Sequence, residues 1–112
     1  MVKLAARHCV PCRGGLPPLD SAGITELLAQ LDGWTVEKQY HLSRTFNLPD
    51  FAQALALVNK IGALAEEEGH HPDLYLSWGV VRVELWTHKI NGLTESDFIL
   101  AAKIDQLTRP GA

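Results

Sequence analysis

The chain has 112 residues, a formal net charge of −3 and a hydrophobic share of 46%. That length suits one compact domain, and the composition is ordinary for a globular protein. Without a basic excess, direct binding to a nucleic-acid backbone is not expected. No apolar run is long enough to cross a membrane, and Lys3 and Arg7 lack the apolar stretch of a secretory signal behind them, so we expect a cytoplasmic protein.

The first 19 residues are rich in proline and glycine, a composition that resists regular structure. We therefore expect a flexible N-terminal arm at residues 1–19 and a single domain at residues 20–112. The arm holds both cysteines, Cys9 and Cys12, spaced as Cys-x-x-Cys. Such a pair can be redox-active or can form half a zinc site with His8, but no second Cys-x-x-Cys follows. Two ordinary thiols in an arm are the simpler interpretation.

The predicted elements begin with a helix at residues 21–31, for which Ser21 is the candidate N-cap and in which leucines recur at helical spacing. Two strands are predicted at residues 34–40 and 42–48, because apolar residues fall on alternate positions in each. A long helix is then predicted at residues 50–68, where apolar residues recur every three or four positions.

The second half of the chain again predicts two strands and a helix. A short strand is expected at residues 74–78 and the clearest strand at residues 80–87, with a turn at Gly79 between them. The last helix is expected to open at Thr94 and to run to about residue 107. Alternating polarity implies an antiparallel sheet with one covered face, and amphipathic helices would cover it. The predicted fold class is therefore α+β, with two layers: a four-stranded antiparallel sheet and helices on one face, in the order α-β-β-α-β-β-α.

The residues most suited to chemistry centre on Gly69-His70-His71-Pro72, directly after the acidic end of the long helix. The glycine and the proline restrict the backbone around the paired histidines. A third histidine, His88, ends the strongest predicted strand and points off the core face. Histidine can donate and accept protons near neutral pH, so a protonated ring and a neutral ring together suit an elimination or a hydration.

Other interpretations stay open on spacing alone. Three neutral histidines and a water would make a hydrolytic zinc centre, although adjacent His70 and His71 lack the i, i+4 spacing that places two ligands on one helical face. Histidine pairs also occur by chance in loops, and His8 and His41 fit isolated surface residues. Asp97 falls where a capping box would place an acidic residue, so a purely structural role is at least as good an interpretation.

An ordered set of residues resembles the signature of the pterin-4a-carbinolamine dehydratase family: Glu66-x-x-x-His70-His71-Pro72, an aromatic at Trp78, Thr87-His88 and Asp97. Further matches span about residues 24 to 107: Gly33-Trp34, Arg44-x-Phe46, Asp50-Phe51, Val83-x-Leu85 and Gly92-Leu93-Thr94. The resemblance implies a dehydration, without metal or cofactor, of 4a-hydroxytetrahydrobiopterin to quinonoid dihydrobiopterin and water. That step recycles the pterin cofactor of aromatic amino-acid hydroxylases.

The same resemblance implies the site. It makes His70, His71 and His88 the catalytic histidines: one imidazolium would protonate the departing 4a-hydroxyl while a neutral imidazole or water takes the ring N–H proton. The substrate-binding residues that it implies are Glu66, Gly69, Pro72, Trp86, Thr87, Lys89, Asp97 and Trp34. Many relatives carry an acidic or other polar residue at the position of Gly69, so a backbone contact is expected there.

The partners that the resemblance implies are a pterin substrate and further copies of the chain, as a homodimer or homotetramer. Exposed sheet edges and a helix face make self-association physically reasonable. Some members of the family stabilise dimers of a transcription factor, and relatives that have lost histidines assist assembly of other proteins. All three histidines are present here, which favours the enzyme; a protein-binding or coactivator module on the same scaffold is the alternative.

Overall fold

The computed structural model describes residues 4–6, 18–37 and 41–108. In chain order its elements, with η for a short 3-10 helix, are η1 (Leu4–Ala6), α1 (Ser21–Leu28), β1 (Thr35–Glu37), β2 (His41–Asn47), α2 (Phe51–Glu68), β3 (Asp73–Ser77), β4 (Val80–Leu85), η2 (His88–Ile90) and α3 (Glu95–Thr108). The predicted α+β class is confirmed, and the longer helices and the strands follow the predicted order. The Cys9–Cys12 pair and most of the predicted arm lie outside the described residues.

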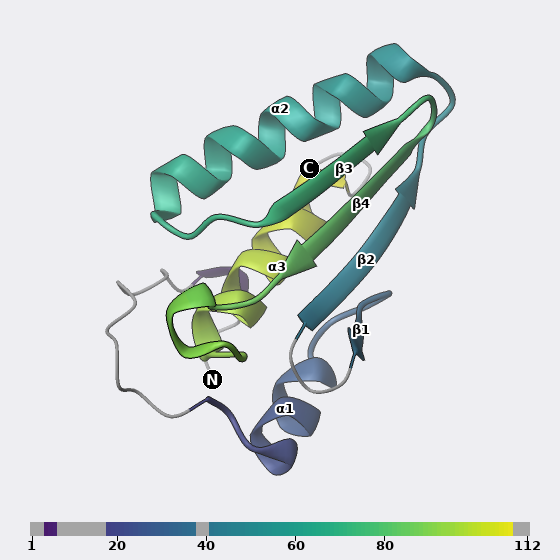
Figure 1. The fold of residues 1–112 in the computed structure, drawn as a ribbon. Helices are drawn as coiled ribbons and strands as arrows, with labels where there is room; N and C mark the ends of the chain where they lie inside the picture. The colour runs from purple at the N-terminus through teal and green to yellow at the C-terminus, as the bar shows by residue number, and fades with distance from the viewer. Residues whose placement is uncertain (1–3, 7–17, 38–40, 109–112) are drawn as a thin grey trace.

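The four strands form one antiparallel sheet in the order β1-β2-β4-β3, so β1 and β3 are its edges. Leu42 on β2 faces Leu85 on β4, and Phe46 faces Val81, which places all four side chains on one face of the sheet. The long helices α2 and α3 pack against each other over this face (Figure 1). The fold therefore has the two layers that the alternating polarity predicted.

A single hydrophobic core fills the space between the sheet and the helices. Val81, Val83 and Leu85 of β4 are fully buried, as are Ile61 of α2 and Leu100 of α3. Burying a side chain of this size stabilises the folded state by about 1.5–3 kcal/mol relative to leaving it in water. The alternate residues of β4 are only partly buried, which explains why its sequence gave the clearest strand pattern.

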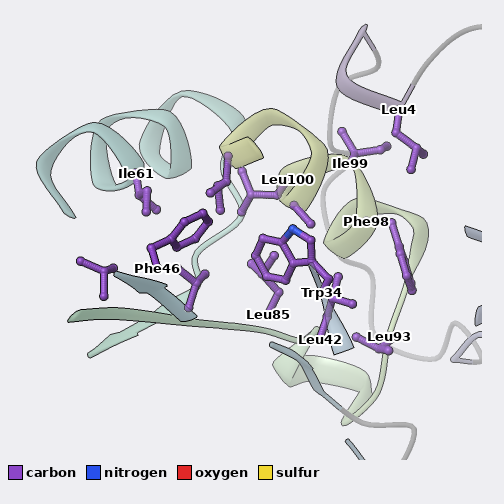
Figure 2. Packing of buried hydrophobic residues seen from close by; sticks show 14 of the residues in the cluster. Leu4, Trp34, Leu42, Phe46, Ile61, Leu85, Leu93, Phe98, Ile99 and Leu100 are labelled. Carbon is purple, nitrogen blue, oxygen red and sulfur yellow. The ribbon is translucent and has the colours of Figure 1, made fainter. Parts of the chain in front are cut away.

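Trp34 lies inside this core, where it faces α3 (Figure 2). Its indole Nε1 donates a hydrogen bond to Asp105 Oδ1 at 2.8 Å, and Arg44 Nη1 donates to the same oxygen at 2.6 Å. The Arg44 guanidinium also lies over the ring of Phe46, 4.5 Å from its centroid. Because Asp105 is buried, its charge has to be paired in this way to be tolerated. The cluster ties α3 to β2 and to the start of β1.

An aspartate is the N-cap of each of the first two α-helices, α1 and α2. Asp20 Oδ1 accepts a hydrogen bond from the Gly23 N–H at 2.8 Å, and Asp50 Oδ1 accepts one from the Gln53 N–H at 2.8 Å. The predicted cap Ser21 is wrong: Asp20 is the N-cap of α1, and Ser21 is the first helical residue. Both residue types cap helices well, and here the chain has one directly after the other, so composition alone could not separate them.

Two described pieces of the N-terminal segment contact the domain. Leu4 in η1 is buried in the core, and Figure 2 shows it beside Ile99 of α3. Leu19 donates a backbone hydrogen bond to the Leu93 carbonyl at 2.8 Å. Flexibility of the arm, residues 1–19, stays a prediction, and its residues 1–3 and 7–17 lie outside the described part of the chain. Within the described ranges, no helix has both the length and the apolar character that a bilayer crossing requires.

Candidate active site

The predicted site begins where α2 ends. Gly69 follows the helix with φ +67°, a left-handed conformation that glycine adopts without steric cost and that ends many helices. The His70 N–H then donates back to the Ala65 carbonyl at 3.2 Å, which closes the last turn. From there the chain passes through Pro72 into β3. This turn fixes the direction in which the paired histidines leave the helix.

His70 points inward, toward the first turn of α3. Only 8% of its surface is exposed, and its Nε2 lies 2.6 Å from Oδ1 of Asp97, which is completely buried. The other carboxylate oxygen of Asp97 accepts hydrogen bonds from the Thr87 hydroxyl and the Thr94 N–H, each at 2.9 Å. With three partners, the buried carboxylate is held in one position and in turn fixes the orientation of the His70 ring.

Asp97 also has the structural role that the capping-box pattern predicted. Its bond from the Thr94 N–H is the half of a capping box in which the third residue of a helix reaches back to the N-cap. The Thr94 hydroxyl completes the cluster at 3.0 Å from the Thr87 hydroxyl. The two interpretations of Asp97 are therefore compatible, because the same carboxylate caps α3 and holds His70.

His71 points outward, unlike His70. Its Nε2 contacts Oε2 of Glu66, one turn back on α2, and both side chains are exposed. An exposed ion pair of this kind adds little to stability. Its neighbour Glu68 is used differently, since it lies 3.6 Å from Lys103 of α3 in a largely buried contact. At the acidic end of α2, Glu66 therefore contacts a surface histidine, whereas Glu68 contributes to the contact between α2 and α3.

The sequence predicted that His88 would end a strand. Instead, β4 stops at Leu85 and His88 opens η2. The reason is a tight loop: the Thr87 N–H bonds the Gly92 carbonyl at 2.8 Å and turns the chain away from the sheet. The His88 ring lies 4.0 Å from the Trp86 ring, centroid to centroid. Its Nε2 is 3.8 Å from Oδ1 of Asp73.

Asp73 was not among the predicted site residues. Its Oδ2 accepts a hydrogen bond from Trp86 Nε1 at 3.1 Å, while Oδ1 faces His88. The signal that could have identified it is its place directly after His71 and Pro72, at the start of β3. Because Asp73 contacts both Trp86 and His88, it joins the segment after α2 to the segment after β4.

The structure brings most of the predicted residues to one end of the sheet. The Thr87–Asp97 bond links His70 to the segment that carries His88, and Gly69 and Pro72 flank the paired histidines. Lys89 is the middle residue of η2. Trp34 has a different environment: it is 5% exposed and contacts Asp105 and Phe46 in the core.

Every histidine that the structure describes has a carboxylate neighbour: His41 with Glu84, His70 with Asp97, His71 with Glu66 and His88 with Asp73. A carboxylate beside one ring nitrogen orients the ring and selects its tautomer, which leaves the other nitrogen available for proton transfer. Among the described residues, no group of three or more histidine, cysteine, aspartate or glutamate side chains is arranged to hold a metal ion. The structure thus provides acid–base groups on three segments: the start of β2, the turn after α2, and η2.

Known proteins are similar to this chain in sequence over nearly its full length. The family model described as pterin 4 alpha carbinolamine dehydratase matches residues 17–107. A protein of Rickettsia bellii, provisionally named a pterin-4-alpha-carbinolamine dehydratase, is 56% identical over 105 residues, 93% of each chain. A protein of Rubrobacter xylanophilus with the same provisional name is 50% identical over 107 residues, which cover 96% of this chain and all of that one.

Solved structures share the fold. A Brucella melitensis protein described as a transcriptional coactivator/pterin dehydratase superimposes with a TM-score of 0.77 at 32% identity, over 82% of this chain and 99% of that one. A pterin dehydratase-like protein, described as a RuBisCO assembly factor in the alpha-carboxysome, gives a TM-score of 0.58 at 26% identity, over 67% of this chain and 88% of its own. Sequence and fold agree, and the chain belongs to the pterin-4-alpha-carbinolamine dehydratases, a family of hydro-lyases.

Proposed function

We propose that the chain dehydrates 4a-hydroxytetrahydrobiopterin to quinonoid dihydrobiopterin and water, and so recycles the pterin cofactor of aromatic amino-acid hydroxylases. The observation that carries this proposal is the buried contact of 2.6 Å between His70 and Asp97, close in the fold to two further histidines. The reaction breaks the C4a–O bond, so it needs one group to protonate the hydroxyl and another to take the ring N–H proton. A cluster of imidazoles with separate carboxylate partners suits that division.

The geometry suggests a role for each histidine. His70 turns Nε2 to Asp97, which leaves Nδ1 as the nitrogen that can accept the ring proton, and Asp97 would stabilise the imidazolium that forms. His71 and His88 are open to solvent and can be recharged with protons from water. We assign them the donation of a proton to the leaving hydroxyl and the positioning of the pterin. Glu66, Gly69, Pro72, Trp86, Thr87 and Lys89 stay proposed substrate contacts.

The test is an ultraviolet assay of 4a-hydroxytetrahydrobiopterin dehydration with EDTA present throughout. The wild type is compared with His70→Ala, His71→Ala and His88→Ala, and with Glu67→Gln as a control on the exposed face of α2. We expect rapid turnover by the wild type and by the control. The His70 variant should lose about 10²–10⁴-fold in rate, the usual contribution of a general acid or base. Failure of folded wild-type protein to accelerate the reaction would remove the proposal, and loss of its activity in EDTA would favour a metal mechanism.

A protein-binding role is the second candidate. It is favoured by the solved relatives described as a transcriptional coactivator/pterin dehydratase and as an assembly factor. If this chain also binds a protein partner through a separate surface, binding should survive His70→Ala and His88→Ala while dehydration is lost. Loss of both properties in the same variants would place the two roles at one site.

We also propose that the chain forms a homodimer or a homotetramer. The edge strand β3 exposes Tyr75 and Leu76, and Trp78 in the following turn is 69% exposed. On α2, Phe51 and Leu55 are exposed, while other residues of the helix, Gln53, Ala56, Leu57 and Lys60, line a groove of about 300 Å³ with the end of α3. Unpaired strand edges and apolar helix faces are surfaces that a second copy can cover. The cytoplasmic location stays a prediction from the sequence.

A further inference from the structure

His41 lies in a ring cluster that the proposed reaction does not use. It starts β2, and its ring centroid is 4.5 Å from that of Trp86, with the planes tilted by 35°. The sheet register explains the contact: Ser43 faces Glu84, so two residues further along the same antiparallel pair His41 comes beside Trp86. Trp86 in turn contacts the ring of His88 at 4.0 Å. Trp86 is thus the common neighbour of two histidines from different segments.

Carboxylates hold both ends of this cluster. Glu84 Oε1 lies 3.3 Å from His41 Nδ1, and the other oxygen of Glu84 is 3.5 Å from Arg82 Nε. At the opposite end Asp73 accepts the hydrogen bond from the Trp86 indole at 3.1 Å. These contacts come from three neighbouring strands, β2, β4 and β3. The Trp86 ring is therefore fixed by its N–H on one side and by the packed His41 ring on another.

His88 has weaker support of its own. It opens a three-residue 3-10 turn, half of its side chain is exposed, and its distance of 3.8 Å from Asp73 is too long for a hydrogen bond. The close contact that the structure gives its ring is the one with Trp86. Whatever holds the Trp86 indole in place therefore helps to set the position of His88.

We infer that His41 is a positioning residue for His88 and that it acts through the Trp86 ring. This inference rests on the proposed function, in which His88 serves the dehydration. Removing the His41 ring would free the Trp86 indole to pivot about its hydrogen bond to Asp73, and His88 would lose its defined place. Small displacements of this kind are costly in catalysis, since a shift of about 1 Å can lower a rate roughly 10²-fold. Because the effect comes from ring packing, a phenylalanine at position 41 should hold the Trp86 indole in place as the histidine does.

The first test is NMR of the imidazole signals of His88 in the full chain without substrate. Trp86→Leu removes the indole and its ring-current effect, and so defines the signal of a His88 without this neighbour. We expect His41→Ala to move the His88 signal part of the way toward that position. His41→Phe should leave it near the wild type, as should Thr45→Ala, an exposed control on the same strand and face. His41→Val serves as a second variant without a ring if the alanine variant does not fold.

The second test is the kinetics of the same variants. We expect kcat/KM to fall about tenfold in His41→Ala and to recover in His41→Phe, since the displaced Trp86 and His88 rings are a proposed pterin contact and a proposed reacting group. An unchanged His88 signal in both ringless variants, or a phenylalanine variant that behaves like alanine, would overturn the inference. The two proposals fail separately: a wild type without dehydratase activity removes the proposed reaction, whereas the NMR comparison needs no turnover.

Discussion

Asp97 is the residue on which the site and the fold depend together. Its carboxylate accepts bonds from His70, Thr87 and Thr94, and none of its surface reaches solvent. Removal of its charge affects both the orientation of His70 and the start of α3. A single substitution can therefore report on catalysis and on stability at once.

We expect Asp97→Asn to lower the dehydration rate about 10²-fold, because the amide cannot stabilise an imidazolium. The same change should lower the free energy of unfolding by about 1–3 kcal/mol, since an NH₂ group replaces an acceptor and leaves a buried donor unpaired. The ultraviolet assay and urea unfolding measure the two effects. Wild-type turnover by a well-folded Asp97→Asn would show that the His70–Asp97 contact plays no part in the reaction.

Residues whose partners are near in the sequence were the easier ones to predict. The pair His70 and His71 was evident because Gly69 and Pro72 bracket it within one turn. His41 was interpreted as an isolated surface residue, yet it packs on Trp86, far along the chain. That contact depends on the register between β2 and β4, and alternation of polarity does not specify a register. Asp73 was missed for the same reason, since its contacts with Trp86 and His88 arise from strand pairing.

At the scale of elements, α2 has one glycine inside it and one directly after it, and the two differ in backbone conformation. Gly62 is within the helix and Gly69 follows it at φ +67°, and at neither position would a Cβ atom meet a neighbour within 4 Å. Steric crowding is therefore the same in both places, and only the backbone conformation differs. This makes them a matched pair of sites.

We expect Gly62→Ala to raise the free energy of unfolding by about 0.5–1 kcal/mol, because alanine restricts the unfolded chain and suits a helix interior. Gly69→Ala should lower it by about 1–2 kcal/mol, the cost of a left-handed residue with a Cβ. Gly69→Asn should cost less than Gly69→Ala. Urea midpoints measure all three, and equal effects of alanine at both positions would show that the turn before His70 is not held in the left-handed conformation.

Element boundaries were less predictable than the elements themselves. The alternating pattern of β4 continues through Trp86 and Thr87, so the sequence predicted a strand to residue 87. The strand ends at Leu85 because the Thr87 N–H bonds Gly92 across the η2 loop. Alternating polarity predicts which face of the sheet a side chain occupies, but it does not predict which residue the backbone is hydrogen-bonded to. The helix α1 starts at Ser21 as predicted, but its N-cap is Asp20 and it ends at Leu28 instead of residue 31.

At the scale of the whole molecule, the two-layer architecture was predictable because every long element is amphipathic. The order of the strands, β1-β2-β4-β3, and the burial of Trp34 were not. Trp34 was assigned to the site from the family resemblance, whereas its contacts are with Asp105 and Phe46 in the core. An aromatic residue at the start of a strand can face either layer, and here the buried Asp105 provides the partner for its N–H.

The exposed apolar residues lead to a prediction about assembly. We expect light scattering of the wild type to give two or four times the chain mass of 12.3 kDa. Trp78→Glu at the β3 edge and Leu55→Glu on α2 each place a charge in one candidate interface. Both should lower the mass of a tetramer, and one of them should lower the mass of a dimer. Gln30→Glu in the exposed turn after α1 adds the same charge as a control. A monomeric wild type at micromolar concentration would contradict the prediction.

The hydrogen-bonded contact between His70 and Asp97 also has a consequence for folding kinetics. The two residues are 27 positions apart, on the end of α2 and the start of α3, so their contact exists only after α3 has docked. The His71–Glu66 contact, in contrast, spans five positions and can form as soon as α2 does. During refolding, recovery of dehydratase activity should therefore lag behind recovery of helical circular dichroism and coincide with burial of Trp34. Enzyme activity is then a stricter measure of the native state than secondary structure.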